Sequence, residues 1–134
     1  MNSIPAVVLG ATGYVGGELL RLIAAHPVFE LAAAVSESRA ETPVGDTFPH
    51  LAAALGDTPF AAHGTWLERI PGGSPLALFS AAPHGASAAM IATVLEQASA
   101  RGIEVHTVDV SADFRYSDAA AYEAVYGTAH GAPQ

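Results

Sequence analysis

Three glycines spaced three residues apart, Gly10, Gly13 and Gly16, constrain the fold of this chain more than any other feature of its sequence. They follow directly on an apolar run at residues 4–9, which is typical of a buried strand. Beyond them, apolar side chains recur with the spacing of an amphipathic helix over residues 15–26. Together with the apolar run that comes next, they form a strand–glycine loop–helix–strand unit of about 35 residues, the size of a βαβ crossover.

The remainder of the chain continues the alternation of strands and helices. Further strands are predicted at residues 30–35, 60–62, 76–80 and 105–110, and helices at residues 51–55, 86–100 and 119–126. The side chains predicted to face the core are Val15, Leu19, Leu22, Ile23 and His26 on the first helix and Met90, Ile91, Val94 and Leu95 on the helix at 86–100. Gly102 follows this second helix at the C′ position, where a glycine commonly ends a helix. The pattern predicts one α/β domain over residues 1–134, with a doubly wound, mostly parallel sheet of the Rossmann type.

The composition excludes several classes of protein. Hydrophobic residues make up 51% of the 134 and charged residues 13%, which excludes extended disorder. Thirteen acidic residues against five arginines give a net charge of −8, which argues against nucleic acid as a partner. No Cys is present for a disulfide, a thiolate metal site or a thiol nucleophile, and no His pair has the i, i+4 spacing of a helical metal site. Without a membrane-length apolar run or a basic N-terminal region, we expect a cytoplasmic protein without membrane contact.

Each glycine of the loop has a distinct predicted task. Gly10 lets the chain turn sharply, Gly13 lets the backbone approach a pyrophosphate, and Gly16 lets helix and sheet pack closely. The first helical turn adds unpaired N–H groups and the positive end of the helix dipole. The predicted dinucleotide-binding loop comprises Gly10, Ala11, Thr12, Gly13, Tyr14, Val15 and Gly16. The alternative is a tight turn that binds no ligand, and Tyr14 either covers the pyrophosphate or packs on the sheet.

The residues after the second strand bear on which dinucleotide binds. An NAD site has an acidic residue there, about 20 residues past the loop, that binds the ribose 2′-hydroxyl. Here Ser36 takes that position, and Ser38 and Arg39 follow. Two hydroxyls and a guanidinium can bind a 2′-phosphate through charge-assisted hydrogen bonds, so these three residues predict NADP as the cofactor. Glu37 leaves NAD open, since its carboxylate could bind the ribose, and Arg39 could be only a solvated loop charge.

Several segments form a more specific pattern when taken together. They are residues 10–22 (GATGYVGGELLRL), residues 82–85 (APHG) and residues 108–115 (VDVSADFR), with His26-Pro27 between them and Tyr122, Tyr126 and His130 after them. This pattern resembles the N-acetyl-gamma-glutamyl-phosphate reductases of arginine biosynthesis. The resemblance implies an enzyme that reduces an acyl phosphate, N-acetyl-glutamyl 5-phosphate, to the semialdehyde with NADPH. In that family a Cys thiolate expels phosphate to form a thioester, which then accepts the hydride.

The resemblance also implies roles for particular residues. The segment beside the nicotinamide and pyrophosphate would be Ala82, Pro83, His84 and Gly85, and the residues that meet the acyl phosphate would be Ser111 and Arg115. Members of the family are more than twice as long, and their catalytic Cys and His lie beyond the matching region. We therefore expect this chain to be the cofactor-binding portion of a homo-oligomeric enzyme, without a catalytic residue of its own.

Alternatives stand beside these assignments. The His84 ring could form only a structural hydrogen bond, and Arg115 could pair with Asp113 or Asp118 at the surface. The chain could be the corresponding portion of aspartate-semialdehyde dehydrogenase, which shares the mechanism but usually lacks the Pro-His-Gly loop. It could also be a non-catalytic dinucleotide-binding module, which the absence of Cys supports.

Overall fold

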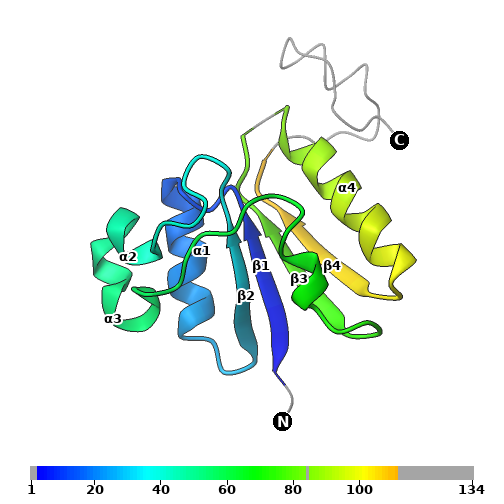
Figure 1. The fold of residues 1–134 in the computed structure, drawn as a ribbon, viewed down its shortest axis with the longest axis horizontal. Helices are drawn as coiled ribbons and strands as arrows, with labels where there is room; N and C mark the ends of the chain where they lie inside the picture. Colours follow the sequence, from blue (N-terminus) through cyan, green and yellow to red (C-terminus); the bar gives the residue numbers. More distant parts are fainter. Residues whose placement is uncertain (1–2, 84, 112–134) are drawn as a thin grey trace.

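The computed structural model describes residues 3–83 and 85–111, and within them four strands form one parallel sheet. The strands are β1 (Ile4–Leu9), β2 (Phe29–Val35), β3 (Pro75–Ser80) and β4 (Glu104–Asp109), in the order β2-β1-β3-β4. The helices are α1 (Tyr14–Ala24), α2 (Val44–Thr47), α3 (Ala52–Leu55) and α4 (Ser87–Ala100), with 3-10 turns at Pro49–Leu51 and Leu67–Arg69. Because all the pairings are parallel, the carboxyl ends of the strands meet at one edge of the sheet (Figure 1).

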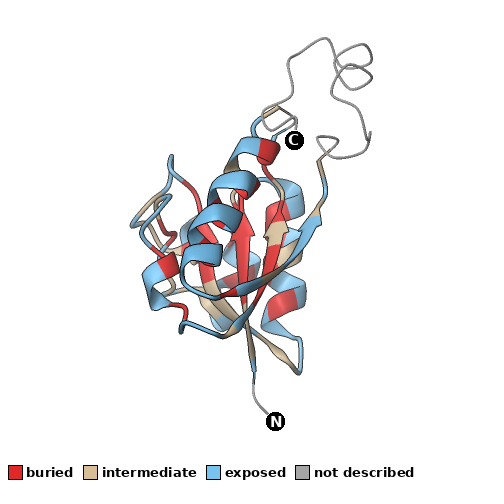
Figure 2. Cartoon of the chain, turned by 90° about the vertical axis from the view of Figure 1, so that its right-hand side faces the viewer, coloured by how far each residue is buried: buried red, intermediate tan, exposed pale blue. Residues whose placement is uncertain are grey.

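Helices cover both faces of the sheet, which confirms the doubly wound, Rossmann-type architecture (Figure 2). Successive residues of a strand point to opposite faces, so β1 contributes to two separate cores. Val7 and Leu9 pack with the residues of α4, whereas Ala6 and Val8 pack with those of α1. All four are buried, as expected for a central parallel strand.

The four predicted strands of the sheet are confirmed to within one residue at each end. The strand predicted at residues 60–62 is wrong, because this segment forms only a single parallel bridge between Ala61 and Val35. Pro59, just before it, has no N–H to donate to a longer ladder. The helix predicted at residues 51–55 corresponds to the end of the 3-10 turn at Pro49–Leu51 and to α3. Helix α2 was not predicted. The helix predicted at 119–126 lies outside the described residues.

The face that α1 buries matches the predicted one only in part, at Ile23 and at the half-buried Leu19. Its buried residues are Gly16, Gly17, Leu20 and Ile23, whereas the side chains of Val15 and Leu22 are exposed. The two glycines explain the difference. A Cβ on Gly16 would lie 2.6 Å from the Ala11 backbone, and one on Gly17 would lie 2.6 Å from the Phe48 ring. The start of the helix therefore packs through two residues that have no side chains, which a count of apolar positions does not detect.

The ends and rims of the long helices also refine the predictions. Helix α1 ends at Ala24, so His26 lies beyond it, exposed, where its Nδ1 accepts the backbone N–H groups of Val28 and Phe29. On α4, Ile91 and Val94 are buried as predicted, but Leu95 is exposed at the rim. Gly102 has a φ of +70°, and the Ile103 N–H donates to the Ala98 carbonyl (3.0 Å). This is the Schellman arrangement that a C′ glycine allows.

Gly10 is the residue on which the turn after β1 depends. Its φ is +65°, and a Cβ there would lie 2.7 Å from both the N and the Cα of Ala82. Gly10→Ala combines left-handed backbone strain with a clash against main chain, so we expect the free energy of unfolding to fall by about 3 kcal/mol. Urea denaturation followed by circular dichroism measures this loss.

The matched control is Gly73→Ala. Gly73 has a φ of +80°, but a Cβ there would meet nothing within 4 Å, so only the backbone cost of about 1 kcal/mol should remain. Equal losses in the two variants would contradict the close approach of Gly10 to Ala82.

Candidate functional site

The glycine loop, residues 10–16, is fixed between two neighbouring strand ends. The N–H of Ala11 donates to the carbonyl of Val35 at the end of β2 (3.1 Å). On the other side, the N–H of Ala81, just after β3, donates to the carbonyl of Leu9 (2.9 Å). The loop therefore lies at the carboxyl edge of the sheet, where open α/β sheets bind their ligands.

Gly13 is the N-cap of α1 and leaves the first turn of the helix open. Its φ is −82°, and a Cβ there would meet nothing within 4 Å. No side chain caps the helix, and no acidic residue lies in its first turn. The N–H groups of that turn can therefore bind an anion. Tyr14 is 99% exposed, so the predicted alternative in which it packs on the sheet is wrong.

Ser36, Ser38 and Arg39 come together in the turn after β2. The Oγ atoms of Ser36 and Ser38 lie 3.4 Å apart, and the N–H of Arg39 donates to Ser36 Oγ (3.3 Å). Ser36 is buried, whereas Ser38 and Arg39 are exposed. No carboxylate in the described ranges pairs with the Arg39 guanidinium. The turn thus contains two neighbouring hydroxyls followed directly by a cationic residue, a combination that suits a phosphate group.

Arg21 and Arg101, unlike Arg39, have hydrogen-bond partners for their guanidinium groups among the described residues. Arg21 is hydrogen bonded to the carboxylate of Glu18, one turn away on α1, and this bond lowers the pKa of Glu18 and raises the pKa of Arg21. The Arg101 guanidinium donates to the main-chain carbonyls of Leu67 and Ile70.

The carboxylate of Glu37 is bound to the backbone of a neighbouring loop. Its Oε1 accepts the N–H of His63 (2.6 Å) and lies 3.8 Å from the Nδ1 of the His63 ring. His63 follows the segment that pairs with the end of β2 through the Val35–Ala61 bridge. The acidic side chain that the sequence left open as a ribose ligand thus has a protein partner.

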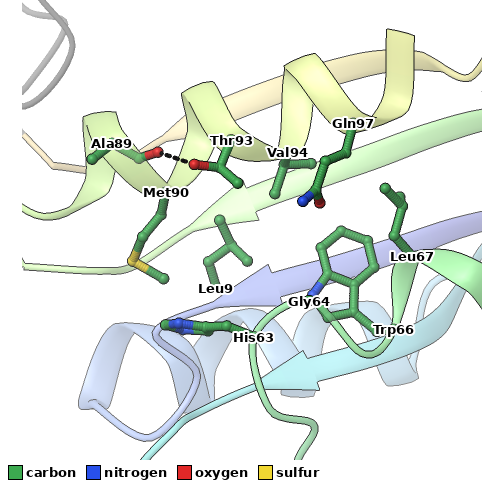
Figure 3. Close-up of a pocket in the computed structure, with 10 residues that line it drawn as sticks. All are labelled: Leu9, His63, Gly64, Trp66, Leu67, Ala89, Met90, Thr93, Val94 and Gln97. Carbon is green, nitrogen blue, oxygen red and sulfur yellow. Dashed lines mark hydrogen bonds between the residues drawn. The ribbon is translucent and has the colours of Figure 1, made fainter. Parts of the chain in front are cut away.

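A cavity of about 360 Å³ opens beside His63, between α4 and the segment before the 3-10 turn at Leu67–Arg69 (Figure 3). Leu9, Trp66 and Met90 supply apolar surface, and His63 and Gln97 supply polar groups. The volume lies in the range of small-molecule sites, about 300–1,000 Å³. A mostly apolar lining with few polar groups suits a flat heteroaromatic ring.

A chain of hydrogen bonds joins β3, α4 and β4 at the same edge. The Oγ atoms of Ser80 and Ser87 lie 2.6 Å apart, and Ser87 Oγ donates to Asp109 Oδ1 (2.9 Å). Because Ser87 has one hydroxyl hydrogen, Ser80 must donate to it. Asp109 also accepts the N–H (2.9 Å) and the Oγ–H (3.0 Å) of Ser111. This Ser–Asp network fixes Ser111, a predicted substrate-binding residue, relative to the start of α4.

The loop after β3 brings Ala82, Pro83 and Gly85 to this edge, and Ala82 lies against Gly10. Gly85 has a φ of +86°. His84 and Arg115 lie outside the described residues, so their predicted roles stay predictions. In residues 3–83 and 85–111, no cluster of His, Asp and Glu could hold a metal ion, and no helix is long and apolar enough to span a membrane.

Comparison with known protein families agrees with this geometry. Residues 5–131 match the family described as semialdehyde dehydrogenase, NAD binding domain. The chain belongs to this family. It is 46% identical to the N-acetyl-gamma-glutamyl-phosphate reductase of Acidothermus cellulolyticus over 123 residues, 92% of this chain and 32% of that protein. It is 41% identical to the reductase of the same name from Neisseria gonorrhoeae over 132 residues, 98% of this chain and 35% of that protein.

This NAD-binding domain spans about a third of the length of these relatives. A solved structure has the same fold: the crystal structure of aspartate semialdehyde dehydrogenase with NADP from Candida albicans. It superposes with a TM-score of 0.60 at 24% identity and covers 88% of this chain and 32% of its own. This likeness supports the fold.

The Ser–Asp network and the cavity of this NAD-binding domain were not predicted from the sequence. Ser80 and Asp109 end two neighbouring strands and pair in register, so polar residues at two adjacent strand ends were a usable signal. His63 and Trp66 had no comparable signal, because they lie in a turn-rich segment without periodicity.

Ser87→Ala tests the Ser–Asp network of this domain. The change leaves the buried Ser80 hydroxyl and the Asp109 carboxylate each without one partner, so we expect the free energy of unfolding to fall by about 2 kcal/mol. Ser99→Ala, at an exposed position of the same helix, should change it by less than about 0.5 kcal/mol. Urea denaturation compares the two, and equal effects would show that the network contributes no specific stability.

Proposed function

We propose that this domain binds NADP and that Ser36, Ser38 and Arg39 hold its 2′-phosphate. The observation that carries the proposal is the turn after β2, where two neighbouring hydroxyls are followed by Arg39, whose guanidinium pairs with no carboxylate of residues 3–83 and 85–111. This is the position where a dinucleotide fold meets the adenine ribose. The Glu37 carboxylate supports it, because it is bound to the His63 backbone.

The other parts of the cofactor have matching surfaces in this proposal. The pyrophosphate is held by the N–H groups of the glycine loop and the first turn of α1, where Gly13 leaves room for it. The adenine ring enters the cavity between His63 and α4. The nicotinamide end faces the loop of Ala82, Pro83, His84 and Gly85. All of these surfaces lie along one edge of the sheet.

We further propose that the complete protein is an N-acetyl-gamma-glutamyl-phosphate reductase that reduces the acyl phosphate to the semialdehyde. The two relatives of that name, at 46% and 41% identity, support this substrate. NADPH, when bound, supplies the hydride. Residues of this chain bind and orient: Ser111 and Arg115 meet the acyl phosphate, and Asp109 holds Ser111 in place. The chain contains no Cys, so it contributes no thiol nucleophile.

The finer features of the proposal rest on the resemblance to these relatives. They are a cytoplasmic location and assembly of the complete enzyme into a homo-oligomer. The substrate is tested on the complete protein: reduction of N-acetyl-glutamyl phosphate supports the proposal, and a preference for aspartyl phosphate would replace it with an aspartate-semialdehyde dehydrogenase.

Arg39→Ala tests the 2′-phosphate site. The variant loses a charge-assisted contact that only NADPH can make, so its affinity for NADPH should fall about tenfold or more while its affinity for NADH stays the same. Arg69→Ala is the matched control, because Arg69 is exposed and lines a depression with Ser3 and Pro5, at the opposite end of β1. Isothermal titration calorimetry with each nucleotide measures both variants. A parallel loss for NADPH and NADH would remove Arg39 from the phosphate site.

Gly13→Ala tests the pyrophosphate position separately from stability. The backbone of Gly13 suits an L-residue, and the added methyl group meets no protein atom within 4 Å. The free energy of unfolding should stay constant or rise by about 0.5 kcal/mol. The affinities for NADPH and NADH should both fall about tenfold, because the methyl group occupies the space of the shared pyrophosphate. Undiminished binding would move the pyrophosphate away from the N-terminus of α1.

A further inference from the structure

Glu37 lies at the end of the second strand, where an acidic residue commonly binds the cofactor ribose, but its carboxylate contacts protein instead. In a dinucleotide-binding fold, an acidic side chain at the end of the second strand binds the ribose hydroxyls. The Glu37 Oε1 instead accepts the N–H of His63 at 2.6 Å, and the His63 ring nitrogen Nδ1 lies 3.8 Å from the same oxygen. A hydrogen bond from a backbone N–H to an ionised carboxylate is charge-assisted and short, so it holds the carboxylate on this loop.

The loop that Glu37 contacts is exposed to solvent along its length. His63, Gly64 and Thr65 are all exposed. Gly64 has a φ of +78°, and a Cβ on it would meet nothing within 4 Å. The loop closes on itself through Thr65, whose Oγ1 donates to the carbonyl of Ala62 (2.8 Å). That bond is local, whereas the bond to Glu37 connects residues 26 positions apart. Within residues 3–83 and 85–111, Glu37 thus provides the hydrogen bond that connects this loop to the turn after β2.

The same loop forms one wall of the cavity. His63 and Gly64 line it on one side, and Met90 and Thr93 of α4 line it on the other (Figure 3). The Thr93 hydroxyl is used within α4, where it donates to the carbonyl of Ala89 (3.0 Å). Since the opposite wall is a regular helix, the width of the cavity depends on where the loop is held.

We propose that Glu37 is a positioning residue that holds the loop at residues 63–65 as a wall of the adenine-binding cavity, and that it does not bind the ribose. This inference rests on the proposed binding of a dinucleotide. Its consequence is specific: Glu37 supports NADPH and NADH equally, because both contain the same adenine. A ribose ligand would instead favour NADH, because the 2′-phosphate of NADPH replaces the hydroxyl that a carboxylate accepts from.

The test compares three variants of the chain by calorimetric titration with NADPH and with NADH. Glu37→Ala removes the acceptor, and we expect both affinities to fall by the same factor, about three- to tenfold. Glu37→Gln retains an oxygen that can accept the His63 N–H, so both affinities should stay within about twofold of the unchanged protein. Glu41→Gln, in the same turn and exposed, removes a carboxylate that forms no hydrogen bond or ion pair with the loop in the part of the chain that the structure describes, and it controls for the loss of negative charge.

A second measurement examines the hydrogen bond between Glu37 and the His63 N–H in the absence of nucleotide. The amide hydrogen of His63 should exchange with solvent about tenfold faster in Glu37→Ala than in the unchanged protein, and at nearly the unchanged rate in Glu37→Gln. Nuclear magnetic resonance resolves this single amide. Equal exchange in all variants would overturn the hydrogen bond itself.

The outcomes separate this inference from the proposed function. If the unchanged protein binds NADPH but Glu37→Ala and Glu37→Gln both weaken NADH selectively, Glu37 is a ribose ligand and the inference is wrong while dinucleotide binding stands. If the folded, unchanged protein binds neither nucleotide, the proposed function fails, and the positioning role fails with it. If Glu37→Ala weakens NADPH and NADH binding equally and Glu37→Gln retains the affinity for both, the result supports both the positioning role and the proposed function.

Discussion

The close approach of Gly10 to the main chain of Ala82 is the contact on which the whole carboxyl edge depends. β1 and β3 are parallel neighbours, with Leu9 opposite Ser80, so the chain leaves both strands at the same level and at the same edge. The two departing segments have room to pass only because Gly10 has no Cβ and adopts a φ of +65°. One segment then forms the glycine loop, and the other forms the loop that precedes α4.

Polar contacts then join the remaining loops in pairs. Ala11 connects the glycine loop to the end of β2, Glu37 connects the turn after β2 to the loop at His63, and the Ser–Asp network connects the ends of β3 and β4. Loops connected in this way are ordered before a ligand arrives. A ligand that contacts several of them loses less affinity to loop ordering than it would on independent loops.

The sequence predicted the parts of this domain whose pattern is local. The four strands of the sheet, the turn at Gly10 and the helix stop at Gly102 follow from apolar runs and glycine positions, and the structure agrees with them. The buried face of α1 was predicted only in part, because Gly16 and Gly17 form much of its packing surface, against the Ala11 backbone and the Phe48 ring.

The candidate site likewise contains local features that the sequence predicted and long-range contacts that it did not. The glycine loop and the Ser36–Arg39 turn are contiguous in the sequence and were predicted. The partner of Glu37 lies 26 residues away in a segment without periodicity, and the network of Ser80, Ser87 and Asp109 combines three elements. Such contacts depend on strand order and register, and a sequence pattern specifies neither directly.

The guanidinium of Arg39, which pairs with no carboxylate of the described residues, has a further consequence because the rest of the chain is strongly acidic. With a net charge of −8, the protein as a whole repels an anionic ligand at a distance, whereas a phosphate in the proposed site is attracted by Arg39 at contact. Ions at physiological strength screen charges beyond about 8 Å, so they suppress the repulsion more than the contact. For a phosphate ligand, added salt therefore raises the rate of association with the protein but weakens the contact with Arg39. These two effects oppose each other in the affinity.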